Sequence, residues 1–162
     1  MNTHNNNNNN NNNAMITVKI YSEERKINKN EKLEIVKFLF THLEQYGDSE
    51  EDISSAVNYS LGEENKPGGL IISAIDESIN KLAGVVVVNK TGMRGYIPEN
   101  ILVYIATDKN QRGKGIGKKL MQHAIESSYG DIALHCEPEN PAKHLYEQLG
   151  FTSKYLEMRL KK

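Results

Sequence analysis

The chain has 162 residues, of which 38% are hydrophobic; this is the size of one ordinary domain, with enough apolar side chains for a core. A formal net charge of −1 provides no positive field to favour nucleic acid or an anionic membrane as a partner. The single cysteine, Cys136, has no CxxC motif or Cys/His neighbourhood, so we predict no metal site and a reducing, cytoplasmic location. The longest apolar runs are strand-sized, so we expect no membrane-spanning segment.

The N-terminal segment, residues 1–14, is dominated by the unbroken run Asn5–Asn13. Asparagine offers no apolar surface to offset the entropy lost on ordering, so this segment is predicted to be a disordered tag or tail. No other linker and no repeat follows it. Residues 15–162 are therefore predicted to form a single domain.

In the first half, alternating apolar and polar residues from Ile16 to Ile20 predict a strand. A helix is predicted next, with Asn28 or Asn30 as its cap and Gly47 as its terminator. Its apolar positions at helical spacing are Leu33, Val36, Phe40 and Leu43. A second helix is predicted from Ser49, which starts a sequence resembling a capping box, to about Gly62. A hairpin with strands at 70–75 and 81–89 follows.

In the second half, strands are predicted at Asn100–Thr107 and Asp131–Cys136, with a helix at Ile116–Tyr129 between them. A helix at Glu139–Leu149 and a last strand at Phe151–Leu160 complete the chain. This order predicts an α/β (α+β) fold with a mixed, mostly antiparallel twisted central sheet flanked by helices.

The most informative stretch is the Gly-rich loop from Asp108 to Gly117, which joins a predicted strand to a predicted helix. Its glycines let the backbone approach a ligand, and the N–H groups at a helix start form an anion site. Basic side chains in and after the loop add positive charge; they are Arg112, Lys114, Lys118 and Lys119. The pattern indicates a pyrophosphate site.

Two common pyrophosphate loops fit this stretch poorly. A P-loop needs Ser or Thr directly after its Gly-Lys pair, whereas Gly115 follows Lys114 here. A dinucleotide fingerprint needs GxGxxG in an early strand–helix–strand unit, whereas Gly113, Gly115 and Gly117 give GxGxG late in the chain.

The spacing of Arg112, Gly115 and Gly117 resembles the RxxGxG loop of the GNAT (GCN5-related) N-acetyltransferase superfamily. A second matching element lies in 140–151, with an alanine, a Leu-Tyr pair and a Gly-Phe pair in the family's order. The family's asparagine precedes the alanine by three positions, whereas Asn140 precedes Ala142 by two. The resemblance is good from about Leu82 to the end and weak before it.

The resemblance implies an acetyl-CoA-dependent N-acetyltransferase that needs no metal. It also implies a splayed strand pair, Asn100–Thr107 and Asp131–Cys136, that holds coenzyme A. Tyr146 takes the family's position of the general acid at the leaving thiolate, with a core aromatic as the alternative. The coenzyme-binding residues that the resemblance implies are Ile105, Ala106, Thr107, Arg112, Gly113, Lys114, Gly115, Ile116, Gly117, Lys118 and Asn140.

The acceptor is predicted to be a primary amine of a small molecule or peptide, bound by a monomer or homodimer. An alkylammonium with a pKa of about 10.4 must lose its proton before it attacks, so a base is useful. Glu99, at the start of a strand, is the candidate base, although it is equally a solvated edge carboxylate. The cluster Glu44, Asp48 and 50–52 either attracts a cationic amine or is a solvated face. Alternatives to an enzyme are a coenzyme-A-binding regulatory module and a protein-interaction domain.

Overall fold

A computed structural model describes residues 15–162. The prediction of disorder for Asn5–Asn13 lies outside the described residues. The described chain forms a five-stranded sheet in the order β1-β2-β3-β4-β5. Neighbouring strands are antiparallel except for β4 and β5, which are parallel. The predicted mixed, mostly antiparallel sheet is confirmed.

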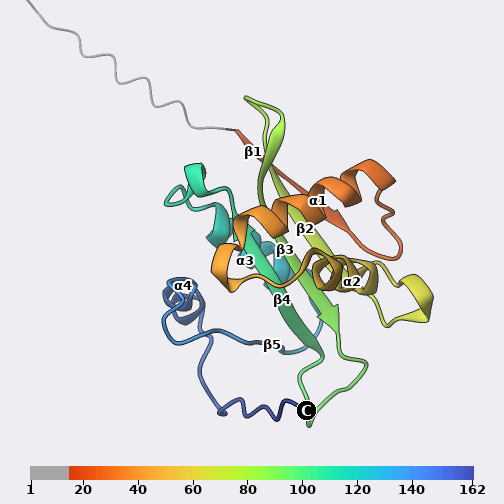
Figure 1. Ribbon diagram of the computed structural model, residues 1–162, viewed down its shortest axis with the longest axis vertical. Helices are drawn as coiled ribbons and strands as arrows, with labels where there is room; N and C mark the ends of the chain where they lie inside the picture. Colours follow the sequence, from red (N-terminus) through yellow and green to blue (C-terminus); the bar gives the residue numbers. More distant parts are fainter. Residues whose placement is uncertain (1–14) are drawn as a thin grey trace, which may run out of the picture.

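The helices cover both faces of this sheet, α1 and α2 on one side and α3 and α4 on the other (Figure 1). In chain order the strands and helices are β1 (Ile16–Tyr21), α1 (Lys29–His42), α2 (Glu50–Ser60), β2 (Gly69–Asp76), β3 (Lys81–Lys90), β4 (Asn100–Thr107), α3 (Ile116–Ser127), β5 (Ile132–Leu134) and α4 (Ala142–Gln148). Short 3₁₀ turns occupy Glu44–Tyr46, Glu63–Asn65 and Lys109–Gln111.

The core consists of two layers that share β2 and β3. Alternate residues of β3 face opposite helical layers, so Val85 and Val87 pack beneath α1 and α2 whereas Val86 and Val88 pack against α3. All four are at most 1% exposed. A strand buried on both faces reads as a continuous apolar run, which explains why the sequence shows no alternation here.

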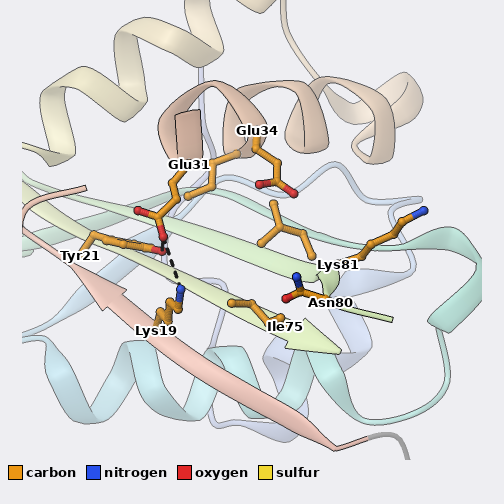
Figure 2. Close-up of a pocket in the computed structure, with 9 residues that line it drawn as sticks. Lys19, Tyr21, Glu31, Glu34, Ile75, Asn80 and Lys81 are labelled. Carbon is orange, nitrogen blue, oxygen red and sulfur yellow. Dashed lines mark hydrogen bonds and ion pairs between the residues drawn. The ribbon is translucent and has the colours of Figure 1, made fainter. Parts of the chain in front are cut away.

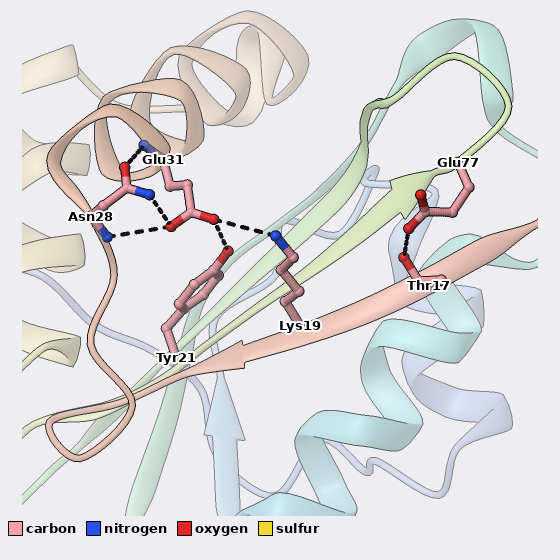
Figure 3. Close-up of polar contacts among 6 residues, drawn as sticks. All are labelled: Thr17, Lys19, Tyr21, Asn28, Glu31 and Glu77. Carbon is pink, nitrogen blue, oxygen red and sulfur yellow. Dashed lines mark hydrogen bonds and ion pairs between the residues drawn. The ribbon is translucent and has the colours of Figure 1, made fainter.

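The first helix begins where the sequence predicts. The Asn28 side chain accepts from the Glu31 backbone N–H at 2.9 Å, and the Glu31 carboxylate accepts from the Asn28 N–H at 3.3 Å (Figure 3). The same carboxylate accepts from the Tyr21 hydroxyl at 3.1 Å and from Lys19 Nζ at 3.3 Å. These contacts tie the start of α1 to β1 and satisfy donors that a helix end otherwise leaves unpaired.

The predicted buried face of α1 is wrong in part. Leu33 is 50% exposed and Phe40 is 51% exposed. The helix buries another face, formed by Ile35, Val36, Phe38 and Leu39. Two overlapping apolar stripes run along this helix, and its packing against α2 and the sheet selects between them.

The predicted last strand is also wrong, because no strand lies in 151–160. Apolar side chains there are exposed by 79–90%, namely Tyr155, Leu156, Met158 and Leu160. A strand needs a partner edge as well as a suitable composition. The adjacent edge strand β5 has three residues rather than the six predicted, and α3 and α4 are likewise shorter than predicted.

Candidate functional site

The free edge of β4 is the first component of the site. Only Asn100, Ile101 and Leu102 pair with β5, and β4 then continues to Thr107 without that neighbour. Asp108 N–H donates to Ala83 O of β3 at 2.9 Å. Because successive N–H groups of a strand point to opposite edges, those of Thr107 and Ile105 point away from β3. Two backbone donors therefore face the open edge.

A β-bulge at Val103 changes the direction of the strand's side chains. Tyr104 lies opposite Val87 while Leu102 lies opposite Val88, which leaves Val103 as the extra residue. Leu102 packs with the α3 layer, whereas Tyr104 packs with the α1–α2 layer. Without the bulge, these two side chains would share a face. Sequence periodicity carries no signal for a single-residue bulge, so the position of Tyr104 was not predicted.

The Gly-rich loop continues directly from the open edge. Gly113 and Gly115 both have φ of +78°, a conformation that side chains other than glycine adopt at a cost. A Cβ atom at either position would meet no protein atom within 4 Å, so space remains beside the backbone. The predicted use of glycine here fits a ligand that lies against the loop.

The start of α3 provides further donors. Gly115 is the N-cap residue and has no side chain to cap the helix. The first helical hydrogen bond runs from Lys119 N–H to Gly115 O at 3.0 Å. The N–H groups of Ile116, Gly117 and Lys118 precede that bond, so they are oriented for an external acceptor. Together with the helix dipole, they form an anion site that suits a pyrophosphate.

The four basic side chains differ in their contacts. Arg112 contacts Glu44 at 3.2 Å and donates to His42 O at 3.1 Å, so its guanidinium joins the loop to the segment after α1. Lys119 donates to Ile16 O at 2.7 Å and is directed to β1 instead. Lys114 and Lys118 are exposed beside the loop. Of the four, these two are available to a bound anion.

Tyr146 lies on α4 in the layer formed with α3. It is 8% exposed, and its ring centroid lies 6.0 Å from that of Phe151. Burial, and secondarily the charge of Cys136, raises the pKa of Tyr146 to about 12. Within residues 15–162, no protein group hydrogen-bonds to its hydroxyl, which remains a protonated donor at neutral pH. The geometry is compatible with both the acid and the core-aromatic interpretations.

Glu99 lies at the opposite end of β4 from the Gly-rich loop. Its carboxylate accepts from Asp131 N–H at 2.8 Å and from Gly95 N–H at 3.3 Å, and these bonds lower its pKa. Six residues of strand place it roughly 20 Å from Ile105. These contacts join the β3–β4 connection to the segment just before β5. The role of Glu99 as a base stays a prediction.

Asn140 has a local partner as well. Its side-chain oxygen accepts from Ala142 N–H at 2.9 Å, at the start of α4. The amide nitrogen of the side chain is the group left for a coenzyme contact. Its assignment to the coenzyme site stays a prediction.

The residues of the acidic segment between α1 and α2 have different hydrogen-bond and ion-pair partners. Glu44 pairs with Arg112, and the Ser49 hydroxyl caps α2 by accepting from Asp52 N–H at 3.1 Å. Asp48 accepts from the Tyr104 hydroxyl at 2.7 Å. Tyr46 reaches across to Glu139 O of the β5–α4 connection at 3.5 Å. The segment therefore spans from β4 to that connection, beside the open edge.

Two cavities lie away from this site. A cavity of 140 Å³ lies between α1 and the first strands, where Lys19 and Tyr21 point toward Glu31 (Figure 2). A cavity of 550 Å³ lies at the β3–β4 connection and is lined in part by Arg94, Glu99 and Tyr129. No residue of the Gly-rich loop lines either of them. The predicted site instead lies along the part of β4 that does not pair with β5.

Neither a metal cluster nor a membrane-spanning helix is found in residues 15–162. No group of three or more His, Cys, Asp or Glu side chains there has metal-binding geometry. No helix in that range is long and apolar enough to cross a bilayer.

The fold is α+β, and its strand–loop–helix unit carries free backbone donors that suit an anion. A family model described as the acetyltransferase (GNAT) domain matches residues 67–153, more than half of the chain. The chain therefore belongs to the GNAT acetyltransferase family, whose members use acetyl-CoA. The match begins just before β2 and ends just after α4, so α1 and α2 lie outside it. No curated protein sequence matches the chain significantly.

Solved structures show the same fold. An aminoglycoside N-acetyltransferase in complex with CoA has 12% identity and a TM-score of 0.65, with 91% of this chain and 95% of that chain covered. A GNAT family acetyltransferase from Streptococcus pneumoniae has 19% identity and a TM-score of 0.63, with 91% and 98% covered. The NatC complex bound to a Gag peptide and CoA has 25% identity and a TM-score of 0.65, with 85% and 84% covered.

Proposed function

We propose that the protein transfers an acetyl group from acetyl-CoA to a primary amine of a small molecule or peptide. The observation that supports this best is the continuous set of backbone donors from the open edge of β4 to the start of α3. A pantetheine arm carries amides that suit a strand edge, and a pyrophosphate suits an uncapped helix start. Along the chain the open strand edge comes before the helix start, just as the pantetheine arm adjoins the pyrophosphate in coenzyme A.

In this proposal the chain's groups act at three points. The N–H of Ile105 polarises the thioester carbonyl, because a donor at the developing oxyanion stabilises the transition state more than the ground state. The neutral amine attacks that carbon, a C–N bond forms, the C–S bond breaks, and the proton lost by the amine nitrogen passes to water. The Tyr146 hydroxyl then donates a hydrogen bond to the departing thiolate. Backbone amides of residues 112–118 and the side chains of Lys114 and Lys118 hold the pyrophosphate.

Two classes of acceptor, small molecules and peptides, remain candidates, and both occur among the structural neighbours. One neighbour is an aminoglycoside N-acetyltransferase and another is a complex bound to a peptide. The helices α1 and α2, beside the open edge, lie outside the family match, so the match does not indicate the acceptor.

Two measurements test the proposal. Titration calorimetry with acetyl-CoA measures coenzyme binding, and a thiol-release assay measures transfer to polyamines, aminosugars, amino acids and peptides. Coenzyme binding with amine-dependent thiol release is the expected result. Binding without release by any amine would favour the regulatory module, whereas absence of binding by the folded protein would overturn the coenzyme site.

A further inference from the structure

Asp48 and Tyr104 form a polar pair on the α1–α2 side of the sheet. The Tyr104 hydroxyl donates to Asp48 Oδ2 at 2.7 Å. Tyr104 is 9% exposed, whereas Asp48 is exposed. The phenol therefore fixes the position of a carboxylate that still faces solvent.

The pair lies close to the proposed site of reaction. The bulge at Val103 directs Tyr104 toward the α1–α2 layer, two residues after the end of the β4–β5 pairing. Its neighbour Ile105 has its N–H at the open edge. Because Tyr104 and Ile105 are adjacent in β4, Asp48 is bonded to the neighbour of the residue whose N–H is proposed to hold the thioester oxygen.

In residues 15–162 Asp48 lacks a basic partner, as do Glu50 and Glu51, and it differs from them in its bond to the buried Tyr104. Glu44 has Arg112 as its cation, and Asp52 takes part in the cap at Ser49. Within the described chain no lysine or arginine forms an ion pair with Asp48. An ionised carboxylate accepts at two oxygens, and the phenol uses one site on one of them. The remaining sites suit an N–H donor of positive charge.

We propose that Asp48, positioned by Tyr104, binds the ammonium group of the acceptor before it reacts. The acceptor class is then an alkyl primary amine that is cationic at neutral pH, such as a lysine side chain or a polyamine. This inference rests on the proposed acetyl transfer and adds the substrate's charge and the residue that recognises it.

The role is capture of the acceptor rather than removal of its proton. A carboxylate beside an ammonium stabilises the charged form, so it opposes deprotonation. Loss of Asp48 should therefore weaken acceptor binding without slowing the chemical step. The expected signature is a higher KM with a kcat that does not fall.

The test compares Asp48→Asn, Tyr104→Phe and the control Glu51→Gln, which changes another exposed carboxylate in the first turn of α2. The acceptors are spermidine, a lysine-containing peptide, and an O-alkylhydroxylamine that is neutral at the assay pH. For the better cationic acceptor, KM should rise roughly fivefold or more in Asp48→Asn, and less in Tyr104→Phe. For the neutral amine, KM should change by less than about twofold. The KM of the double variant Asp48→Asn/Tyr104→Phe should equal that of Asp48→Asn, because Tyr104 acts through Asp48.

Four results would overturn this inference. Equal losses with cationic and neutral acceptors would mean that the substitutions disturb the site generally. An unchanged KM in Asp48→Asn, or the same increase in Glu51→Gln, would remove Asp48 from acceptor recognition. A wild-type protein that binds acetyl-CoA but acetylates no amine would overturn the proposed function itself, and the inference with it. Acetyl-CoA affinity, measured by calorimetry in every variant, should stay within about twofold because Asp48 lies outside the coenzyme loop.

Discussion

Replacement of Tyr146 by phenylalanine separates the two interpretations of this residue, because it removes one oxygen and keeps the ring. The side chain is 8% exposed and packs near Phe151. No protein group within residues 15–162 hydrogen-bonds to the hydroxyl, so its removal leaves no buried partner unsatisfied. The free energy of unfolding should change by about 0.5 kcal/mol or less.

The expected loss of activity follows from the pKa of the phenol. With the pKa of Tyr146 at about 12 and that of a thiol at about 8.5, complete proton transfer to the thiolate is uphill by about 5 kcal/mol. A hydrogen bond to the charged sulfur without transfer is worth about 1.5–3 kcal/mol. Tyr146→Phe should therefore lower kcat by about 10-fold to 150-fold, while acetyl-CoA affinity changes by less than about threefold.

The assay is thiol release at saturating acceptor, with acetyl-CoA affinity measured separately by calorimetry. The loss should shrink when the acetyl donor carries a more acidic leaving thiol, since a better leaving group needs less help. Equal turnover in the phenylalanine variant would refute the acid role and leave Tyr146 as a core aromatic.

Burial of Tyr146 also predicts how stability depends on pH. Because the folded-state pKa of about 12 exceeds the unfolded value of about 10, the folded protein holds the proton more tightly. This stabilisation is fully present below pH 10 and is lost as the pH rises through 12. Between these values the wild type should lose up to about 3 kcal/mol more unfolding free energy than Tyr146→Phe, measured by urea denaturation. Parallel curves for the two proteins would contradict the raised pKa.

Three further substitutions test the site and its support. Gly115→Val should weaken acetyl-CoA binding by roughly tenfold or more, whereas Gly95→Val, which also has φ of +78° and no protein atom within 4 Å of a Cβ, should leave the affinity unchanged; equal losses in both would remove Gly115 from the coenzyme site. Gly84→Ala should destabilise the fold by about 1–3 kcal/mol in urea denaturation, because the new Cβ would lie 2.7 Å from Leu120 Cδ1; full stability would show that α3 can shift. Glu99→Gln should lower the melting temperature, because a carboxylate oxygen that accepts from a backbone amide is replaced; a fall in kcat of roughly tenfold or more would in addition support the predicted base, whereas unchanged kcat would contradict it.

The order of elements was predictable because each one has a local signal. The cap at Asn28, one of two predicted candidates, the cap at Ser49 and the helix start after the Gly-rich loop are specified by neighbouring residues, and the structure confirms these three positions. The buried face of α1 and the fate of 151–160 depend on distant partners. For α1, the packing of α2 selects one of two stripes, and for 151–160 the short edge strand β5 offers little to pair with. Such tertiary choices leave no mark in local periodicity.

In the candidate site, too, the locally determined features were predictable and the contacts with distant residues were not. The donors of 112–118 follow from sequence alone, because glycine spacing before a helix determines where the N–H groups point. The contacts of the charged side chains could not be predicted from the sequence. Arg112 and Lys119 look equivalent in the sequence, yet one is held by Glu44 and the other by Ile16 O. Long basic side chains take whichever partner the fold brings within reach.

The bulge at Val103 links the two halves of the proposed site through one strand. Before the bulge, β4 is an ordinary inner strand with neighbours on both edges. At the bulge the side chains change face, so that Tyr104 is directed to the segment between α1 and α2 and bonds to Asp48. Beyond it, the N–H groups at the outer edge have no strand to pair with in residues 15–162, and they lead into the Gly-rich loop. A single extra residue thus brings the proposed coenzyme-binding edge and the proposed acceptor-facing side chain to adjacent positions on one strand. The proposed coenzyme side lies within the family match, whereas the proposed acceptor side involves helices outside it, so on this proposal proteins with the same loop can differ in the amine that they accept.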